Sequence, residues 1–287
     1  MTPRFGCVVL TQGRRPDDLR RALDSLLGQR DVDVEVVVVG NAWEPEGLPH
    51  GVRGVGLPEN RGIPAGRNAG VAETGGEILF FLDDDARLAS DDALRRVAGI
   101  LAAEPDVGLL QLRVKDPDGK PPARAWVPRL RSGDPARSSD VTAVWEGATA
   151  MPRGVFEEVG GWPERFFYAH EGIELAWRVM DAGHRVRYAG DVTALHPAYP
   201  PARHGFSHYL SARHRVWLAR RNLPLPVGAA YVAVWLAITL ARARSGRDVR
   251  EVLRGYVAGL RQPCGGRRPL RWRTLWRMTR AGRPPVV

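Results

Sequence analysis

One stretch of the chain, residues 60–86, limits the possible folds more than any other. It joins a glycine-rich segment to five consecutive apolar residues, Ile78–Leu82, which end directly at three aspartates. A short, uninterrupted apolar run between glycines and an acidic turn is typical of a strand buried on both faces in a parallel sheet. Ligands of such sheets bind beyond the carboxyl ends of the strands. The pattern therefore predicts that Asp83, Asp84 and Asp85 lie at a binding site.

The three neighbouring carboxylates favour a metal site. Carboxylates held side by side repel one another, and a divalent cation that also bridges to phosphate oxygens removes that repulsion. Hard oxygen ligands of this kind suit Mg2+ or Mn2+. The alternative is a solvated acidic turn at the end of a strand. The position directly after a buried strand favours the metal.

The segment before the apolar run predicts an anion site. Three glycines between residues 62 and 70 let the backbone approach a ligand, because glycine has no side chain and tolerates positive φ. A short helix is predicted over Arg67–Glu73, with Arg67 and Asn68 near its amino terminus. Such a terminus beside a guanidinium binds anions well. Taken alone, the segment fits an ordinary glycine-rich connection better.

Together these residues resemble the donor-site half of a family 2 glycosyltransferase with the GT-A fold. The resemblance identifies Asp83–Asp85 as the DXD element of that family. It implies an α/β fold with a Rossmann-like nucleotide-binding half and a mixed central sheet, followed here by a C-terminal helical segment. It also implies a nucleoside-diphosphate-sugar donor and Mn2+ or Mg2+ as cofactor.

The start of the chain predicts a nucleotide-binding half of a doubly wound sheet. A strand over Phe5–Leu10, a helix over Pro16–Gln29 and a strand over Val34–Val39 follow one another, each strand ending in a polar loop. The family resemblance assigns Thr11, Arg14 and Asn41 to the nucleotide. Gly40 stands where the family usually has an Asp, so the usual acidic contact to the base is missing from this pattern.

A second cluster, residues 145–178, resembles the acceptor half of the same family. It contains the turn Gly160-Gly161-Trp162, further aromatic residues and an acidic residue that opens a helix. The family usually has Glu-Asp there, and the Asp is taken as the general base. This chain has Glu171-Gly172 instead. We expect Glu171 to be the base. The alternatives are Glu174 or a residue elsewhere in the chain, and Glu171 would then be a partner of the helix dipole.

His196 follows a predicted strand at the position where family members carry a metal-binding histidine. Imidazole suits Mn2+ alongside carboxylates and diphosphate. A structural or surface histidine is the alternative. The expected metal ligands are therefore Asp85 and His196. The residues expected to bind the donor are Thr11, Arg14, Asn41, Arg67, Asn68, Asp83 and Asp84.

The remaining elements of the two halves, which together cover about residues 5–197, are less informative. A helix is predicted over Asp91–Ala103 and a strand over Val107–Leu112. Two short strands are predicted over Arg185–Tyr188 and Val192–Leu195. The segment from Lys115 to Val141 is rich in Pro, Arg, Ser and Gly, and so long a loop is usually functional or disordered.

Charge is distributed unevenly along the chain. The net charge is +10, but residues 201–287 alone carry 18 Arg and two acids, a net +16. After Pro200-Pro201 the sequence becomes basic and then apolar. We therefore predict a catalytic domain over residues 1–222 and a C-terminal segment over 223–287. A basic end on a slightly acidic body favours an anionic partner, either membrane lipid or nucleic acid.

The C-terminal segment predicts helices of two kinds. A basic helix over Tyr209–Asn222 precedes an apolar one over Leu225–Ala241, which is at the lower limit for a bilayer span. Either it lies in the membrane interface, with Tyr231 and Trp235 as anchors, or it packs as a core helix. Two basic amphipathic helices are predicted to follow, over Arg247–Leu260 and Leu270–Arg280.

The amino terminus and the cysteines favour the cytoplasm. Met1–Arg4 leads straight into an apolar strand that is too short for a signal peptide. Cys7 and Cys264 make no disulfide framework, which fits a reducing compartment. With the basic C-terminus, this predicts a peripheral or monotopic protein at the inner face of the cell membrane.

The function implied is metal-dependent, inverting transfer of a hexosyl or deoxyhexosyl group to a glycan or lipid-linked acceptor, as in cell envelope polysaccharide synthesis. The element Arg268–Trp272 resembles one in processive enzymes but lies far beyond Glu171, so we predict a non-processive enzyme. One alternative is a nucleotidyltransferase of related fold. Another is a non-enzymatic protein that binds nucleic acid or membranes, although no nucleic acid is expected because the tryptophans do not form an exposed sheet platform.

Overall fold

The computed structural model describes residues 2–198 and 205–286, and the Pro200-Pro201 boundary expected from the sequence lies outside them. Within the described residues, the strands form one nine-stranded sheet in the order β3-β2-β1-β4-β8-β6-β9-β5, with β7 paired to β9. The strands are β1 (Arg4–Thr11), β2 (Asp33–Asn41), β3 (Val52–Leu57), β4 (Ile78–Asp83), β5 (Arg87–Leu88), β6 (Val107–Lys115), β7 (Ser139–Asp140), β8 (Ala148–Pro152) and β9 (Arg185–Leu195).

Strand β4 lies where the parallel and the mixed halves of the sheet meet. It pairs in parallel with β1, which pairs in parallel with β2, and β2 does so with β3. On its other side β4 pairs with β8 in the antiparallel direction, and β8 pairs likewise with β6. The expected buried strand is confirmed, but only one of its two neighbours is parallel to it.

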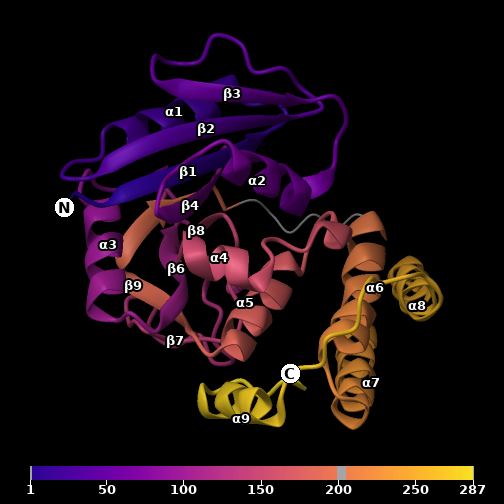
Figure 1. The fold of residues 1–287 in the computed structure, drawn as a ribbon. Coiled ribbons are helices and arrows are strands. Elements are labelled where there is room, and N and C mark those ends of the chain that lie inside the picture. Colours follow the sequence, from indigo (N-terminus) through magenta and orange to yellow (C-terminus); the bar gives the residue numbers. More distant parts are fainter. Residues whose placement is uncertain (1, 199–204, 287) are drawn as a thin grey trace.

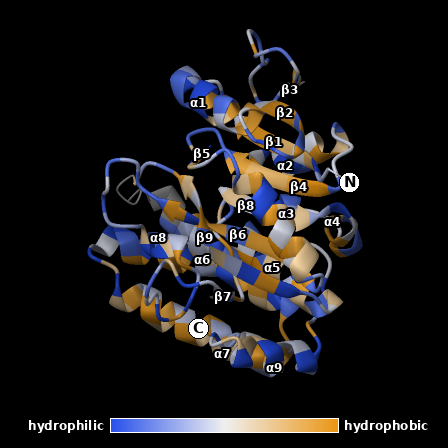
Figure 2. Ribbon diagram, turned by 90° about the vertical axis from the view of Figure 1, so that its left-hand side faces the viewer, coloured by the Kyte–Doolittle hydropathy of each residue, from blue (hydrophilic) through white to orange (hydrophobic). Residues whose placement is uncertain are grey.

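Both faces of β4 are covered, which explains its uninterrupted apolar sequence. Leu79 and Phe81 belong to one buried cluster, and Phe80 and Leu82 belong to the other. Helices α2 (Gly62–Ala72), α4 (Arg153–Val159) and α5 (Glu171–Ala182) contribute to the first cluster, while α1 (Pro16–Leu27) and α3 (Ala93–Ala103) contribute to the second. The sheet is therefore enclosed between two helical layers (Figure 1), and its strands β1, β2 and β4 are mostly hydrophobic in Figure 2.

Two expected elements differ from the structure. Helix α2 begins at Gly62, so the expected start at Arg67 is wrong, and Arg67 and Asn68 lie in its interior. The helix can begin early because Pro64 falls in its first turn, where a missing N–H removes no helical hydrogen bond. The two short strands expected after α5 are one strand, β9, whose pairing with β6 is interrupted by a register shift between Leu112 and Arg113.

The C-terminal helices are α6 (Gly205–Asn222), α7 (Leu225–Ala241), α8 (Gly246–Arg261) and α9 (Trp272–Arg280). Helix α8 packs closely on α6 because Gly255 and Gly259 face it: a Cβ at 255 would lie 2.7 Å from that of Ala212. Tyr231 of α7 and Met278 of α9 are buried in the cluster beneath the sheet. The C-terminal segment thus contributes to the core.

Helix α7 has the bounds expected from the sequence, and it combines the two alternatives considered for it. Its Tyr231 ring is buried against Trp177. Its other side is partly exposed, with Leu225, Ala229 and Ala233 open to solvent. Among residues 2–198 and 205–286, no helix combines the length and apolarity that a membrane crossing requires.

Candidate active site

A cleft of about 730 Å³ lies at the carboxyl ends of β1, β2 and β4. This is the edge at which ligands bind in sheets of this topology. The loop before α5 closes one side of the cleft with Phe167 and Tyr168. The other lining residues are Leu10, Thr11, Gln12, Arg14, Arg15, Asn41, Asn60, Gly62, Ile63, Asp83, Asp84, Asp85 and His196.

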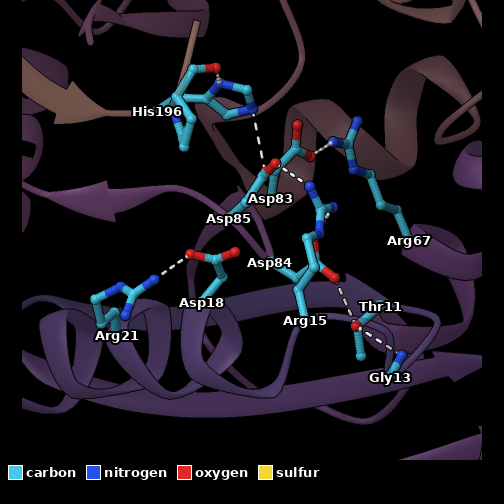
Figure 3. Close-up of polar contacts among 11 residues, drawn as sticks. Thr11, Gly13, Arg15, Asp18, Arg21, Arg67, Asp83, Asp84, Asp85 and His196 are labelled. Atoms are coloured by element: carbon cyan, nitrogen blue, oxygen red, sulfur yellow. Dashed lines mark hydrogen bonds and ion pairs between the residues drawn. The ribbon is translucent and has the colours of Figure 1, made fainter. Parts of the chain in front are cut away.

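The three aspartates point to different partners (Figure 3). Asp83 accepts a hydrogen bond of 2.7 Å from Arg67. Asp84 accepts one of 2.6 Å from the hydroxyl of Thr11 and is only 6% exposed. Asp85 lies with its Oδ1 atom 3.1 Å from Nε2 of His196. Each carboxylate of the triplet therefore has a defined partner within the protein. The alternative of a solvated acidic turn is wrong.

Asp83, Asp85 and His196 fit a divalent cation. One potential ligand atom from each lies within 4.8 Å of the other two. Two carboxylates and an imidazole suit Mn2+ or Mg2+. Asp83, which we had expected to contact the donor, thus lies beside the two expected metal ligands. Asp84 is turned away from the cluster toward Thr11.

The pKa values at this edge follow from burial and pairing. Burial raises the pKa of Asp84 to about 6, against the hydrogen bond from Thr11 and the charge of Arg15. Burial also acts on Asp85, but the hydrogen bond and charge of His196 outweigh it and lower the pKa of Asp85. The same contact raises the pKa of His196 although burial opposes this. Asp85 therefore stays ionised more readily than Asp84.

Arg15 holds two of the aspartates together, and the sequence analysis did not single it out. Its guanidinium donates to Oδ1 of Asp84 over 2.5 Å and to Oδ2 of Asp85. Arg14, which the sequence analysis did select, lies exposed at the rim of the cleft. Adjacent arginines in the loop after the first strand were the available signal. Only the fold shows which of the two reaches the acidic triplet.

Asn41, at the end of β2, forms hydrogen bonds with residues just before α2. Its side chain accepts from the N–H of Arg61 over 2.8 Å and donates to Asn60 over 2.8 Å. The preceding residue, Gly40, has no room for a side chain, because a Cβ there would overlap the carbonyl group of Trp43. The absence of the family's usual Asp at this position therefore has a steric cause.

Arg67 and Asn68 support the site from within α2 and are absent from the lining of the cleft. Arg67 is 2% exposed, bonds Asp83, and lies 4.9 Å from the ring centre of Trp162. Asn68 both donates to the backbone carbonyl of Trp162 and accepts from its N–H, each over 2.9 Å. The expected anion site at a helix amino terminus is not formed by these two residues.

Glu171 and Glu174 both lie in the first turn of α5 and have different surroundings. Glu174 is fully buried and is held by Arg221, at 2.6 Å, and by Asn222, at 2.9 Å. Glu171 is 2% exposed, and its Oε2 atom has no hydrogen-bond partner among the described residues. These contacts tie Glu174 to α6, whereas Oε2 of Glu171 is left without a partner among the described residues; neither residue is in the lining of the cleft.

A further acid, Glu146, meets the beginning of α5, and the sequence analysis gave it no role. The N–H of Gly172 donates to its Oε1 atom over 2.8 Å. Burial and the neighbouring charge of Glu146 raise the pKa of Glu171 to about 8. Burial likewise raises the pKa of Glu146. Two carboxyl groups therefore meet at the amino terminus of α5.

The loop that carries the aromatic rim has an unusual backbone. Phe167, Ala169 and His170 adopt positive φ angles of 58°, 67° and 75°. The carbonyl of Phe167 accepts from the N–H of Ile63 over 2.8 Å, which joins this loop to the start of α2. Non-glycine residues in this region are strained and persist where the surroundings fix them. The hydrogen bond between Ile63 and Phe167 is one such constraint on this loop.

Part of the long loop between β6 and β8 packs around His196, the candidate metal ligand. Trp126 is buried, with its ring centre 5.7 Å from that of His196. The ring centre of Trp145 lies 5.0 Å from the same imidazole and 6.2 Å from that of Trp126, so the three rings pack together. The functional interpretation of this loop is thus favoured over disorder, since it fixes the orientation of a candidate metal ligand.

Residues 7–160 match the Glycosyl transferase family 2. This match covers more than half of the chain and includes the sheet edge with its acidic triplet. The protein is therefore a family 2 glycosyltransferase with the GT-A fold, and it is an enzyme. Family membership decides for this class over the nucleotidyltransferase considered above.

Curated relatives of known name agree with this class. The chain is 29% identical over 259 residues to the O-antigen biosynthesis protein RfbC of Myxococcus xanthus, covering 78% of this chain and 20% of the relative. It is 25% identical over 255 residues to the pre-mycofactocin glycosyltransferase of Mycobacterium tuberculosis, covering 81% of this chain and 52% of the relative. The chain thus spans at most about half the length of these relatives.

A solved structure of similar fold is that of the mannosyltransferase PcManGT from Pyrobaculum calidifontis, in complex with GDP-Man and Mn2+. The TM-score is 0.60 at 22% sequence identity, with 98% of this chain and 85% of that chain covered. The likeness extends the fold assignment to nearly the whole chain.

Proposed function

We propose that this protein transfers a hexosyl or deoxyhexosyl group from a nucleoside-diphosphate sugar to an acceptor hydroxyl, with inversion at the anomeric carbon and with the help of Mn2+ or Mg2+. The cluster of Asp83, Asp85 and His196 at the mouth of a 730 Å³ cleft carries this proposal. The PcManGT complex, of similar fold, contains both a nucleotide sugar and Mn2+, which supports a donor of this class.

The donor would lie along the carboxyl ends of β1, β2 and β4. Arg14 and Asn41 line the cleft and would face the nucleotide, with Thr11 and Asp84 forming its floor. Arg67 and Asn68 would act from behind, by holding Asp83 and the Trp162 turn in place.

Asp85 and His196 would hold the cation, with Asp83 beside them. When bound there, the ion neutralises the negative charge that develops on the leaving diphosphate. Arg15 donates to both Asp84 and Asp85, so it keeps the carboxylates oriented and reduces their mutual repulsion.

Glu171 would act as the general base. It would accept the proton of the acceptor hydroxyl as the hydroxyl oxygen bonds to the anomeric carbon from the face opposite the diphosphate. The bond between that carbon and the diphosphate oxygen breaks, and its electron pair leaves with the nucleoside diphosphate. Glu171 opens α5 directly after the aromatic rim of Phe167 and Tyr168, which supports a place near an acceptor.

The acceptor we propose is a glycan or a lipid-linked molecule at the cytoplasmic membrane, as in synthesis of cell envelope polysaccharide. The relative RfbC is named for O-antigen biosynthesis, and residues 201–287 carry a net charge of +16. Residues 1–222 would form the catalytic domain, and residues 223–287 a C-terminal segment that binds anionic lipid as a peripheral or monotopic element.

A screen of nucleotide sugars tests the proposal. The purified chain is incubated with UDP-, GDP- and dTDP-sugars and Mn2+, and release of the nucleoside diphosphate is measured. We expect slow hydrolysis of one donor class, abolished by EDTA and by Asp85→Asn. If no nucleotide sugar is consumed and no nucleoside diphosphate binds by calorimetry in the presence of Mn2+, the proposed function is wrong.

A further inference from the structure

Glu146 and Glu171 come from distant parts of the chain and meet at the amino terminus of α5. Glu146 lies just before β8, and Glu171 is the first residue of the helix. The N–H of Gly172 donates to Oε1 of Glu146 over 2.8 Å, which places the Glu146 carboxyl group against the first helical turn. Since helix amino termini favour negative charge, this is a favourable position for a carboxylate.

Gly172 makes the room that the Glu146 carboxyl group occupies. A Cβ at position 172 would lie 2.7 Å from both Cγ and Cδ of Glu146, with its Oε1 closer still. Any side chain there would displace the carboxyl group. The space beside Glu171 that a side chain at position 172 would fill is thus taken by an acid from the loop before β8.

The charges around this pair do not balance if both acids are ionised. Arg67 is the cation whose charge acts on Glu146 and Glu171 alike, and it already donates to Asp83. The charges of all three acids also act on the phenol group of Tyr168, whose pKa is raised by burial and by these charges. Since Arg67 is bonded to Asp83, which belongs to the candidate metal cluster, Glu146 and Glu171 would leave a net negative charge if both were ionised, and one retained proton would reduce it.

The backbone that carries Glu146 is joined to the candidate metal site on both sides. The N–H of Asp83 donates to the carbonyl of Gly147 over 3.0 Å. The ring of Trp145 packs against His196. Glu146 is partly exposed, while Glu171 is 2% exposed. Of the two acids, Glu146 therefore has more of its surface exposed, although neither is among the residues that line the cleft.

We propose that Glu146 is a second catalytic residue: it and Glu171 hold one proton between them and act as a single proton acceptor, in which Glu146 contacts the acceptor hydroxyl. This inference rests on the proposed function and refines the role given there to Glu171. The hydroxyl proton passes to the ionised carboxyl group of the pair as the new bond to the anomeric carbon forms. The pair then holds two protons and returns one to solvent after the products leave.

The test compares Glu146→Gln, Glu171→Gln and the double variant. The readout is release of nucleoside diphosphate, with Mn2+ and the nucleotide sugar that the wild type hydrolyses fastest, so that water is the acceptor. We expect each single change to lower kcat by about 10² to 10⁴, as loss of a general base does. The double variant should be no slower than the slower single one, because the residues act as a unit.

Controls separate catalysis from folding and donor binding. Binding of the nucleoside diphosphate with Mn2+, measured by calorimetry, should stay within about twofold of wild type in all three variants. Glu157→Gln, an exposed acid on α4 with its side chain 64% exposed, should have no effect. Gly172→Ala should lower kcat like Glu146→Gln, because its Cβ displaces the Glu146 carboxyl group.

The pH profile distinguishes proton sharing from a structural role. Glu146→Gln removes the neighbouring charge that raises the pKa of Glu171, so the acid limb of the residual kcat should move to lower pH. A Glu146→Gln variant with wild-type kcat, additive losses in the double variant, or an unmoved acid limb would overturn the inference alone. A wild type that consumes no nucleotide sugar would overturn the proposed function and this inference together.

Discussion

Nε2 of His196 lies 3.1 Å from Oδ1 of Asp85, at the point where the end of β9 meets the turn after β4. Asp85 follows β4, which pairs in parallel with β1. His196 follows β9, which lies in the mixed half of the sheet. Trp126 and Trp145 hold the imidazole ring in place. The proposed metal site therefore depends on both halves of the fold.

Asp85→Asn and His196→Ala should each remove the metal dependence of the enzyme. An amide or a methyl group cannot replace an anionic or imidazole ligand, and loss of several kcal/mol of transition-state stabilisation lowers the rate by about 10² or more. Mn2+ titrations of nucleoside diphosphate release measure this effect. Asp118→Asn, an acid with its side chain 70% exposed, is the matched control. Retention of most activity by Asp85→Asn at saturating Mn2+ would refute the assignment.

The buried carboxyl group of Glu171 should make stability depend on pH. Its pKa rises from 4.5 to about 8 because of burial and the nearby Glu146. The folded state thus keeps a proton that the unfolded chain loses, so the free energy of unfolding falls as the pH rises from 4.5 toward 8. In Glu171→Gln this fall should be smaller.

Thermal unfolding of the metal-free protein between pH 5 and 8.5 measures this difference. The Tm of Glu171→Gln relative to wild type should rise across that range by a few degrees. Glu157→Gln, at an exposed position, should follow the wild-type curve. A constant difference in Tm at all pH values would contradict the raised pKa.

Glu174→Gln should destabilise the protein while leaving the catalytic step intact. The carboxylate is fully buried and bonds Arg221 and Asn222 of α6. Removing one partner of a buried ion pair leaves the other charge uncompensated, which typically costs about 3–5 kcal/mol. Urea unfolding measures the loss. If kcat per folded molecule falls as in Glu171→Gln while stability is unchanged, Glu174 is the base instead.

The sequence predicted those parts of the site that depend on local pattern. The apolar run before Asp83 identifies a central strand, and the polar residues after two further strands must lie at the same edge of the sheet. Arg15 and Glu146 were missed because their partners are distant in the sequence. The early start of α2 was missed because Pro64 was not recognised as a residue of a first helical turn.

The C-terminal helices carry an exposed surface that combines apolar and basic side chains. On α8, Leu253, Val257 and Leu260 are exposed at 45%, 45% and 60%. On α9, Trp272 and Trp276 are each 64% exposed, four residues apart. Exposed arginines lie among them on both helices: Arg250, Arg254, Arg261, Arg273 and Arg280. Amphipathic helices of this kind bind at the interface of anionic membranes.

Substitution on this surface tests membrane binding better than truncation. A chain ending at Asn222 would lose Tyr231, Leu275 and Met278 from the buried cluster that also contains Trp177, and so would also lose stability. Exposed side chains can be changed without this effect. The informative variants are Leu253→Ser with Leu260→Ser on α8, and Trp272→Ser with Trp276→Ser on α9.

In vesicle flotation, we expect the wild type to float with anionic vesicles at low salt and much less with neutral ones. Each basic residue near such a surface contributes about 1 kcal/mol, screened within about a Debye length. High salt should therefore weaken binding without abolishing it. The binding that persists at high salt is due to apolar insertion, and it should be lost in the variants, whose Tm should equal that of the wild type. Leu130→Ser, at an exposed apolar position of the catalytic domain, is the control. A wild type that stays in the supernatant with anionic vesicles at low salt would rule out the membrane surface.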